Sequence, residues 1–193
     1  LSQQLWLQLS HREDLYGKYK ELTLSNLKDF GSKVDTQEEK EIDIVLQGKY
    51  SKYALDTAEH YLNLEFVNKV IISCWVDDVL PVCNNERIIF IQNNYPSVNG
   101  TGNRNLQIVS SYGGLKHVTT DFAIKMRNDQ RYDLDSMNKM YDFFHQNKER
   151  ITTFEGDETK PKNRILVAGM FEGFPFHPRD HVFWGHKEDL LDI

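Results

Sequence analysis

A short apolar segment near the middle of the chain runs directly into a group of charged side chains. The apolar part is residues 122–126, and Arg127 and Asp129 follow it. In an open α/β sheet, a carboxylate at the carboxyl end of a strand lies where such sheets bind their ligands. Asp129 offers oxygen ligands that suit a divalent metal, and the cations Lys125, Arg127 and Arg131 offer positive charge to a diphosphate. The alternative interpretation is a solvated, charged turn after a strand.

Composition and charge indicate a soluble globular protein of ordinary size. The 193 residues are 39% hydrophobic and 27% charged, which allows one domain with a real core. A net charge of −6 argues against a general nucleic-acid binder, so no nucleic-acid partner is expected. No apolar run approaches the roughly 18–20 residues that a transmembrane helix needs. Cys74 and Cys83 are too few for a disulfide framework, which favours free thiols in a reducing compartment.

The organisation of the chain changes near residue 42. Residues 1–41 are polar with scattered leucine and tyrosine, and they end in a charged run. We interpret them as a helical lead-in and linker, and residues 42–193 as one domain of a chain that can be part of a longer protein. The charged run is typical of a solvated connector.

Strand and helix patterns alternate along residues 42–193. Apolar, β-branched runs predict strands at 42–46, 69–75, 87–91 and 122–126, and a late strand at 164–171. Helical spacing of apolar residues predicts helices at 52–64 and 103–112, the second ended by Gly113 and Gly114, and a third that begins after the cap Ser136. This alternation implies parallel strand pairing through crossover helices. The tail 174–192 is dense in histidine, aspartate and aromatic residues and shows little periodicity.

Five segments, in their order along the chain, resemble the WavE-type lipopolysaccharide-synthesis family. They are residues 43–48, 71–75, 103–115, 125–129 and 178–190. The resemblance covers roughly residues 42–193 and rests on the ordered set of segments. It implies an α/β fold of the GT-A type, which is a Rossmann-like, open, mixed and mostly parallel sheet flanked by helices.

The same resemblance implies an activity. The expected function is a bacterial glycosyltransferase that moves a sugar from a nucleotide-sugar donor to a saccharide or lipid-linked saccharide acceptor during lipopolysaccharide or capsule synthesis. Mg²⁺ or Mn²⁺ is the implied cofactor. The implied location is the cytoplasm, with peripheral attachment to the inner membrane as an open alternative.

The resemblance also implies which residues bind the donor. These are Gln47, Gly48, Asn103, Asn105, Gln107, Lys125, Arg127 and Asp129, with Asp129 as the metal ligand. A typical GT-A metal motif has two acids separated by one residue, and here Arg127 stands where the first acid is expected. Arg127 is therefore a candidate for the electrostatic role that a metal has elsewhere.

Three late acids are implied on the acceptor side, where a base must take the proton of the attacking hydroxyl. They are Asp180, Glu188 and Asp189. Asp189 is the preferred base, because Arg179 beside Asp180 favours an ionised and weakly basic carboxylate. The alternative for Asp189 is a structural place at the start of a short helix.

A different function remains open beside the transferase. The chain can be a GT-A-like domain that has lost turnover and serves as a scaffold in a polysaccharide assembly complex. Arg127 at the expected acid position favours this alternative, and the crowded polar tail favours the enzyme. A nucleotidyltransferase would carry a glycine-rich basic loop after the first strand, and residues 47–51 are a poor version of one.

Overall fold

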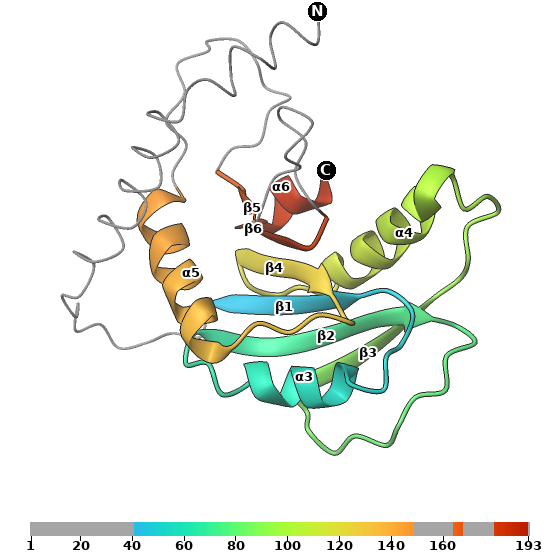
Figure 1. Cartoon of the computed structure of the whole chain (residues 1–193), viewed down its shortest axis with the longest axis horizontal. Helices are drawn as coiled ribbons and strands as arrows, with labels where there is room; N and C mark the ends of the chain where they lie inside the picture. The colour runs from blue at the N-terminus through green and yellow to red at the C-terminus, as the bar shows by residue number, and fades with distance from the viewer. Residues whose placement is uncertain (1–40, 149–163, 168–179, 193) are drawn as a thin grey trace, which may run out of the picture. The chain divides into compact units, whose positions relative to one another are not determined.

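A computed structural model describes residues 41–148, 164–167 and 180–192 (Figure 1). Within these ranges, six strands form one open sheet in the order β3-β2-β1-β4-β6-β5. The strands are β1 (Ile42–Gln47), β2 (Val67–Trp75), β3 (Ile88–Asn93), β4 (Phe122–Arg127), β5 (Leu166–Val167) and β6 (Val182–His186). Strands β1 to β4 pair in parallel, and β6 is antiparallel to both β4 and β5. The predicted open, mostly parallel α/β sheet is confirmed.

Helices cover both faces of this sheet. They are α3 (Ala54–Tyr61), α4 (Arg104–Leu115), α5 (Leu134–Asn147) and α6 (Lys187–Leu191), with a 3-10 turn η1 (Thr101–Asn103) before α4. Residues of α3 and α5 belong to one hydrophobic cluster, and residues of α4 and α6 belong to a second. Figure 1 shows α3 and α4 on opposite sides of the strands.

Strand β1 illustrates why these segments form the centre of the sheet. All six of its residues are buried, as expected for a strand with a helical layer on each face. Its side chains alternate between the two layers: Ile44 and Leu46 pack in the α3/α5 cluster, whereas Val45 packs in the α4/α6 cluster. The predicted strand 42–46 is confirmed and extends by one residue to Gln47.

Two predicted helix boundaries were wrong. Gly113 and Gly114 do not end α4 but lie inside it, because the helix continues to Leu115. A Cβ atom on Gly114 would collide with Val45 and Ser73, so glycine lets the helix approach the sheet closely. The cap of α5 is not Ser136 but Asp133, whose side chain accepts a hydrogen bond from the Ser136 backbone N–H.

The buried carboxylate of Asp43 joins three segments at the amino end of the parallel strands. It accepts hydrogen bonds from the side chain of Asn68 at 2.8 Å and from the backbone N–H of Thr119 at 2.6 Å. The ammonium of Lys69 lies 3.7 Å from it. The hydroxyl of Thr120 accepts from the backbone N–H of Asp43. This cluster fixes the approach of the chain to β4.

The predicted lead-in and linker, residues 1–41, lie outside the described residues except for Glu41. No helix among the described residues is long and apolar enough to cross a bilayer.

Candidate functional site

The carboxyl ends of β1 and β4 lie side by side at a change of direction in the sheet. From β1 the chain proceeds through α3 to β2 on one side, and it returns from β3 through α4 to β4 on the other. The two crossover helices pack on opposite faces. Open α/β sheets bind ligands in the crevice at such a position. Gln47 and Arg127 are register partners there, so the predicted donor segments meet at this edge.

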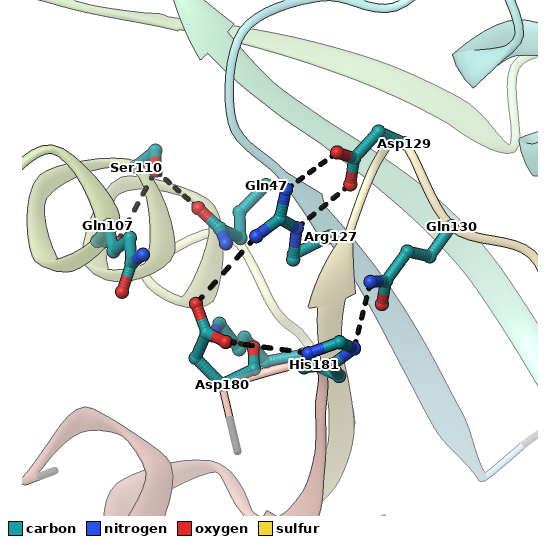
Figure 2. A network of polar contacts seen from close by, with 9 residues as sticks. Gln47, Gln107, Ser110, Arg127, Asp129, Gln130, Asp180 and His181 are labelled. Atoms are coloured by element: carbon teal, nitrogen blue, oxygen red, sulfur yellow. Dashed lines mark hydrogen bonds and ion pairs between the residues drawn. The ribbon is translucent and has the colours of Figure 1, made fainter. Parts of the chain in front are cut away.

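Arg127 and Asp129 form a bidentate ion pair at the end of β4 (Figure 2). The Nε of Arg127 donates to Asp129 Oδ1 at 2.9 Å, and a terminal guanidinium nitrogen donates to Oδ2 at 2.6 Å. These hydrogen bonds hold the pKa of the Asp129 carboxyl below its ordinary value. The side chains are 37% and 50% exposed, so the pair contributes only about 0–1 kcal/mol to stability.

Asp180 approaches the same guanidinium from its other side. Strand β6 runs antiparallel to β4, which brings the residues before it to the carboxyl ends of the parallel strands. Asp180 Oδ2 lies 4.0 Å from the second terminal nitrogen of Arg127. Its other oxygen lies 3.9 Å from His181, and the ring of His181 is hydrogen-bonded to the amide of Gln130. Figure 2 shows Arg127 between the carboxylates of Asp129 and Asp180.

Lys125 lies beneath this group and is 8% exposed. Its ammonium donates to the backbone carbonyl of Asp180 at 3.0 Å and lies 5.0 Å from the centre of the Phe183 ring. Burial lowers the pKa of Lys125 to about 8; the charge of Asp180 acts in the opposite direction, and Arg127 adds to the lowering. Lys125 therefore ties the entry of β6 to β4 and places Asp180 beside Arg127.

The buried position of Lys125 predicts a pH dependence of folding. The folded protein releases this proton near pH 8 and the unfolded chain near pH 10.5. Between these values the unfolded chain binds more protons, so the contribution of Lys125 to the free energy of unfolding rises with pH, by roughly 3 kcal/mol over the whole range. Urea denaturation of wild type and Lys125→Met at several pH values from 7 to 10.5 measures it.

We expect the stability of wild type relative to Lys125→Met to increase across that range. Burial also raises the pKa of Cys74 to about 11 and that of Tyr61 to about 12. Both proteins share these groups, so their effects cancel in the comparison. A difference that stays constant between pH 7 and 10.5 would contradict the assignment.

Gln47 belongs to a buried polar chain beneath α4. Its side-chain oxygen accepts a hydrogen bond from the Ser110 hydroxyl at 2.7 Å. Ser73 donates to the backbone carbonyl of Ser110 at 2.6 Å, and Asn93 donates to the Ser73 hydroxyl at 2.9 Å. These hydrogen bonds join α4 to the carboxyl ends of β1, β2 and β3. Ser110, Ser73 and Asn93 were missed as site-forming residues, because their partners are distant in sequence.

Asn128 fixes the turn that follows β1. Its backbone N–H donates to the carbonyl of Gln47, and its side chain donates to the carbonyls of Gly48 and Lys49 at 3.0 and 2.8 Å. Gly48 has φ of +118°, a conformation that favours glycine. Asn128 was not among the predicted site residues, although it lies between two of them. Asn128 therefore joins the turn after β4 to the turn after β1.

The predicted donor residues of α4 lie at or near the start of the helix. Asn103 is exposed and adopts a left-handed conformation as the N-cap residue of α4. The side chain of Asn105 donates to the carbonyl of Val98, which orders the preceding loop. Gln107 is half-buried, and its backbone carbonyl accepts from Ser110. Figure 2 shows the Gln107 side chain on the same side of α4 as Gln47.

Glu188 and Asp189 are not brought together with Arg127. They belong to the first turn of α6, whose Lys187 donates to the carbonyls of Val118 and Asp121 before β4 begins. This position is at the amino end of β4, whereas Arg127 is at its carboxyl end, and β4 is about 17 Å long. Asp189 is buried and Glu188 is exposed. Their catalytic role stays a prediction.

The predicted Mg²⁺ or Mn²⁺ at Asp129 fits the geometry of the described residues poorly. Both oxygens of Asp129 accept hydrogen bonds from Arg127, whose guanidinium also lies 4.0 Å from Asp180, so a metal at Asp129 would have to compete with this cation. The described part of the chain contains no group of three or more histidine, cysteine or acidic side chains that could hold a metal ion. The cofactor stays a prediction.

Comparison with known proteins identifies a family. The family model described as WavE lipopolysaccharide synthesis matches residues 67–193, which include β2 to β6 and most of the residues described above. A comparison with curated proteins gives no match.

Proposed function

The chain belongs to the WavE lipopolysaccharide synthesis family, and we propose that it acts there as a glycosyltransferase with a nucleotide-sugar donor. Family membership itself implies involvement in lipopolysaccharide synthesis. The observation that carries the finer proposal is the position of Arg127, whose guanidinium lies half-exposed at the carboxyl ends of β1 and β4, near the buried Lys125. A diphosphate leaving group needs such positive charge where negative charge develops.

The proposed reaction transfers the sugar in one displacement. An oxygen of the acceptor forms a bond to the anomeric carbon of the donor sugar. The bond from that carbon to the phosphate oxygen breaks, and its electron pair leaves with the nucleoside diphosphate. A carboxylate takes the proton of the acceptor hydroxyl. In the proposal, Arg127 binds the diphosphate and stabilises its growing charge.

Asp180 is the better placed candidate for the base. Sequence reasoning preferred Asp189, but the Asp180 carboxylate lies 4.0 Å from Arg127, whereas Asp189 lies in the first turn of α6, near the amino end of β4. A base must reach the hydroxyl that attacks the carbon next to the diphosphate. The closeness of Asp180 to Arg127 supports this assignment.

The scaffold alternative is supported by one specific observation. Both carboxylate oxygens of Asp129 accept hydrogen bonds from Arg127, so the guanidinium already has an anionic partner. A domain that no longer turns over substrate can retain such an ion pair, because its arginine does not have to bind a phosphate. Product formation separates the two functions: a donor that binds and is consumed supports the enzyme, whereas binding without transfer or hydrolysis supports the scaffold.

Nucleotide-dependent thermal stabilisation is the expected first result. A nucleoside diphosphate or nucleotide sugar at 100 times its dissociation constant should raise the free energy of unfolding by about 2.7 kcal/mol. The measurement is the melting temperature with a panel of nucleosides, nucleoside diphosphates and nucleotide sugars, with and without Mn²⁺. Bare nucleosides serve as controls, because they lack the diphosphate that Arg127 would bind. An unchanged melting temperature with every nucleotide at millimolar concentration would remove the donor site from this edge.

A further inference from the structure

Asp129 occupies the two guanidinium nitrogens of Arg127 that could bind a phosphate in the same geometry. Its two oxygens accept from Nε and from one terminal nitrogen, a two-pronged geometry that phosphate oxygens also adopt. The second terminal nitrogen of Arg127 faces Asp180 at the longer distance of 4.0 Å. In the free protein, the carboxylate of Asp129 therefore stands where a donor phosphate would bind.

We propose that Asp129 is an internal counter-anion, which the diphosphate of the donor displaces from Arg127, and is not a metal ligand. The proposal rests on the glycosyltransferase function proposed above and assigns the step by which its donor is bound. The diphosphate takes the two nitrogens that Asp129 releases, and the Asp129 side chain turns to solvent. Arg127 then carries the charge-neutralising role that the family resemblance gave to a metal.

The surroundings of the pair favour an exchange of this kind. The Asp129 side chain is 50% exposed and lies on the turn beyond β4, so it can rotate into solvent. The strand end itself is fixed, because Asn128 binds the carbonyls of Gly48 and Lys49 and Arg127 N–H donates to the carbonyl of His181. Only a side chain has to move.

Charge also favours the exchange. The described group of Lys125, Arg127, Asp129 and Asp180 is neutral when all four are ionised, so the free site holds no excess charge. A diphosphate brings more negative charge than one carboxylate and therefore competes well for the guanidinium. After the exchange, Arg127 and Lys125 still face the phosphates from the sheet.

Calorimetric titration with inorganic pyrophosphate in EDTA tests the exchange. Asp129→Asn removes the competing charge and is expected to bind pyrophosphate about two- to fivefold more tightly than wild type. Arg127→Met is expected to bind at least about tenfold more weakly. Asp135→Asn is the matched control, because Asp135 is also an exposed carboxylate in an ion pair, with Lys139. It removes the same charge elsewhere and should bind like wild type.

The outcomes separate this inference from the proposed function. Equal or weaker binding by Asp129→Asn, with measurable binding by wild type, overturns the exchange and leaves the donor site in place. If wild type binds pyrophosphate only with added Mg²⁺ and Asp129→Asn does not bind it, the exchange is also overturned. The donor site is then kept, with Asp129 as a metal ligand. If no variant binds pyrophosphate with or without Mg²⁺, the exchange and the donor site are both wrong. Thermal melting of each variant confirms that it is folded.

Discussion

Arg127→Met is expected to lower the rate of donor consumption by about 10²–10³-fold. The reason is that loss of one well-placed stabiliser of developing charge costs on the order of 3–4 kcal/mol of barrier. Methionine keeps an unbranched apolar stem in place of the arginine stem and removes both the charge and the bidentate donor. The fold should survive, because Arg127 is 37% exposed and its ion pair lies at the surface. The measurement is steady-state consumption of the donor that the thermal screen identifies.

Two further variants make this result specific. Arg127→Lys keeps the charge but loses the fork geometry, so an intermediate rate is expected. Lys139→Met removes an exposed cation of α5 that is paired with Asp135, and it should leave the rate unchanged. Wild-type turnover by Arg127→Met would exclude Arg127 from the reacting site. A loss as large in Lys139→Met would show that only the overall charge matters.

Asp43→Ala should lower the free energy of unfolding by about 3–5 kcal/mol. The Asp43 side chain is fully buried, and Lys69 beside it is 14% exposed, so the substitution leaves a partly buried ammonium without its carboxylate. The side-chain amide of Asn68 and the backbone N–H of Thr119 also lose their acceptor. Buried donors without acceptors are costly. Urea denaturation monitored by circular dichroism gives the change in stability.

Asp135→Ala provides the surface comparison for this prediction. Asp135 is also ion-paired, with Lys139, but 75% of its side chain is exposed. Its removal should leave the denaturation midpoint unchanged. Asp43→Asn should fall between the two, because the amide keeps one acceptor for Thr119 or Asn68 but loses the charge beside Lys69. A midpoint for Asp43→Ala equal to that of wild type would contradict the structural role of the cluster.

The centre of the sheet was predictable from sequence because its strands are continuous apolar runs. Residues 42–46, 69–75 and 122–126 are apolar along most of their length, and each proved to be a mostly buried parallel strand. Parallel pairing places all carboxyl ends on one side of the sheet, but that β1 and β4 are neighbours, with Gln47 beside Arg127, is known only from the structure.

Strand β6 was not predicted, and its direction in the structure favours a different base from the one that the sequence suggested. The segment Val182–His186 is five residues long, contains Gly185 and shows no clear alternation of polar and apolar residues. Its antiparallel direction puts Asp180 at the site and sends Asp189 to the far edge. Strand direction depends on tertiary packing, which a pattern of residue types does not contain.

Polar pairs between distant segments were also beyond sequence reasoning. Ser110 and Gln47 are 63 residues apart, and Asn128 and Gly48 are 80 residues apart. Serine and asparagine are typical of loops and caps, so neither residue type signals a buried partner. The pairing of Arg127 with Asp129 is different, because the two residues lie only two positions apart, at the last residue of β4 and in the turn that follows it.

A crystal structure with the nucleoside diphosphate of the identified donor, grown in the presence of Mn²⁺, tests the central claim most directly. We expect the diphosphate to accept hydrogen bonds from Nε and a terminal nitrogen of Arg127, with the Asp129 side chain turned away and Asp180 facing the position of the sugar. A Mn²⁺ ion held between Asp129 and the diphosphate, or a nucleotide bound away from the β1/β4 edge, would contradict it.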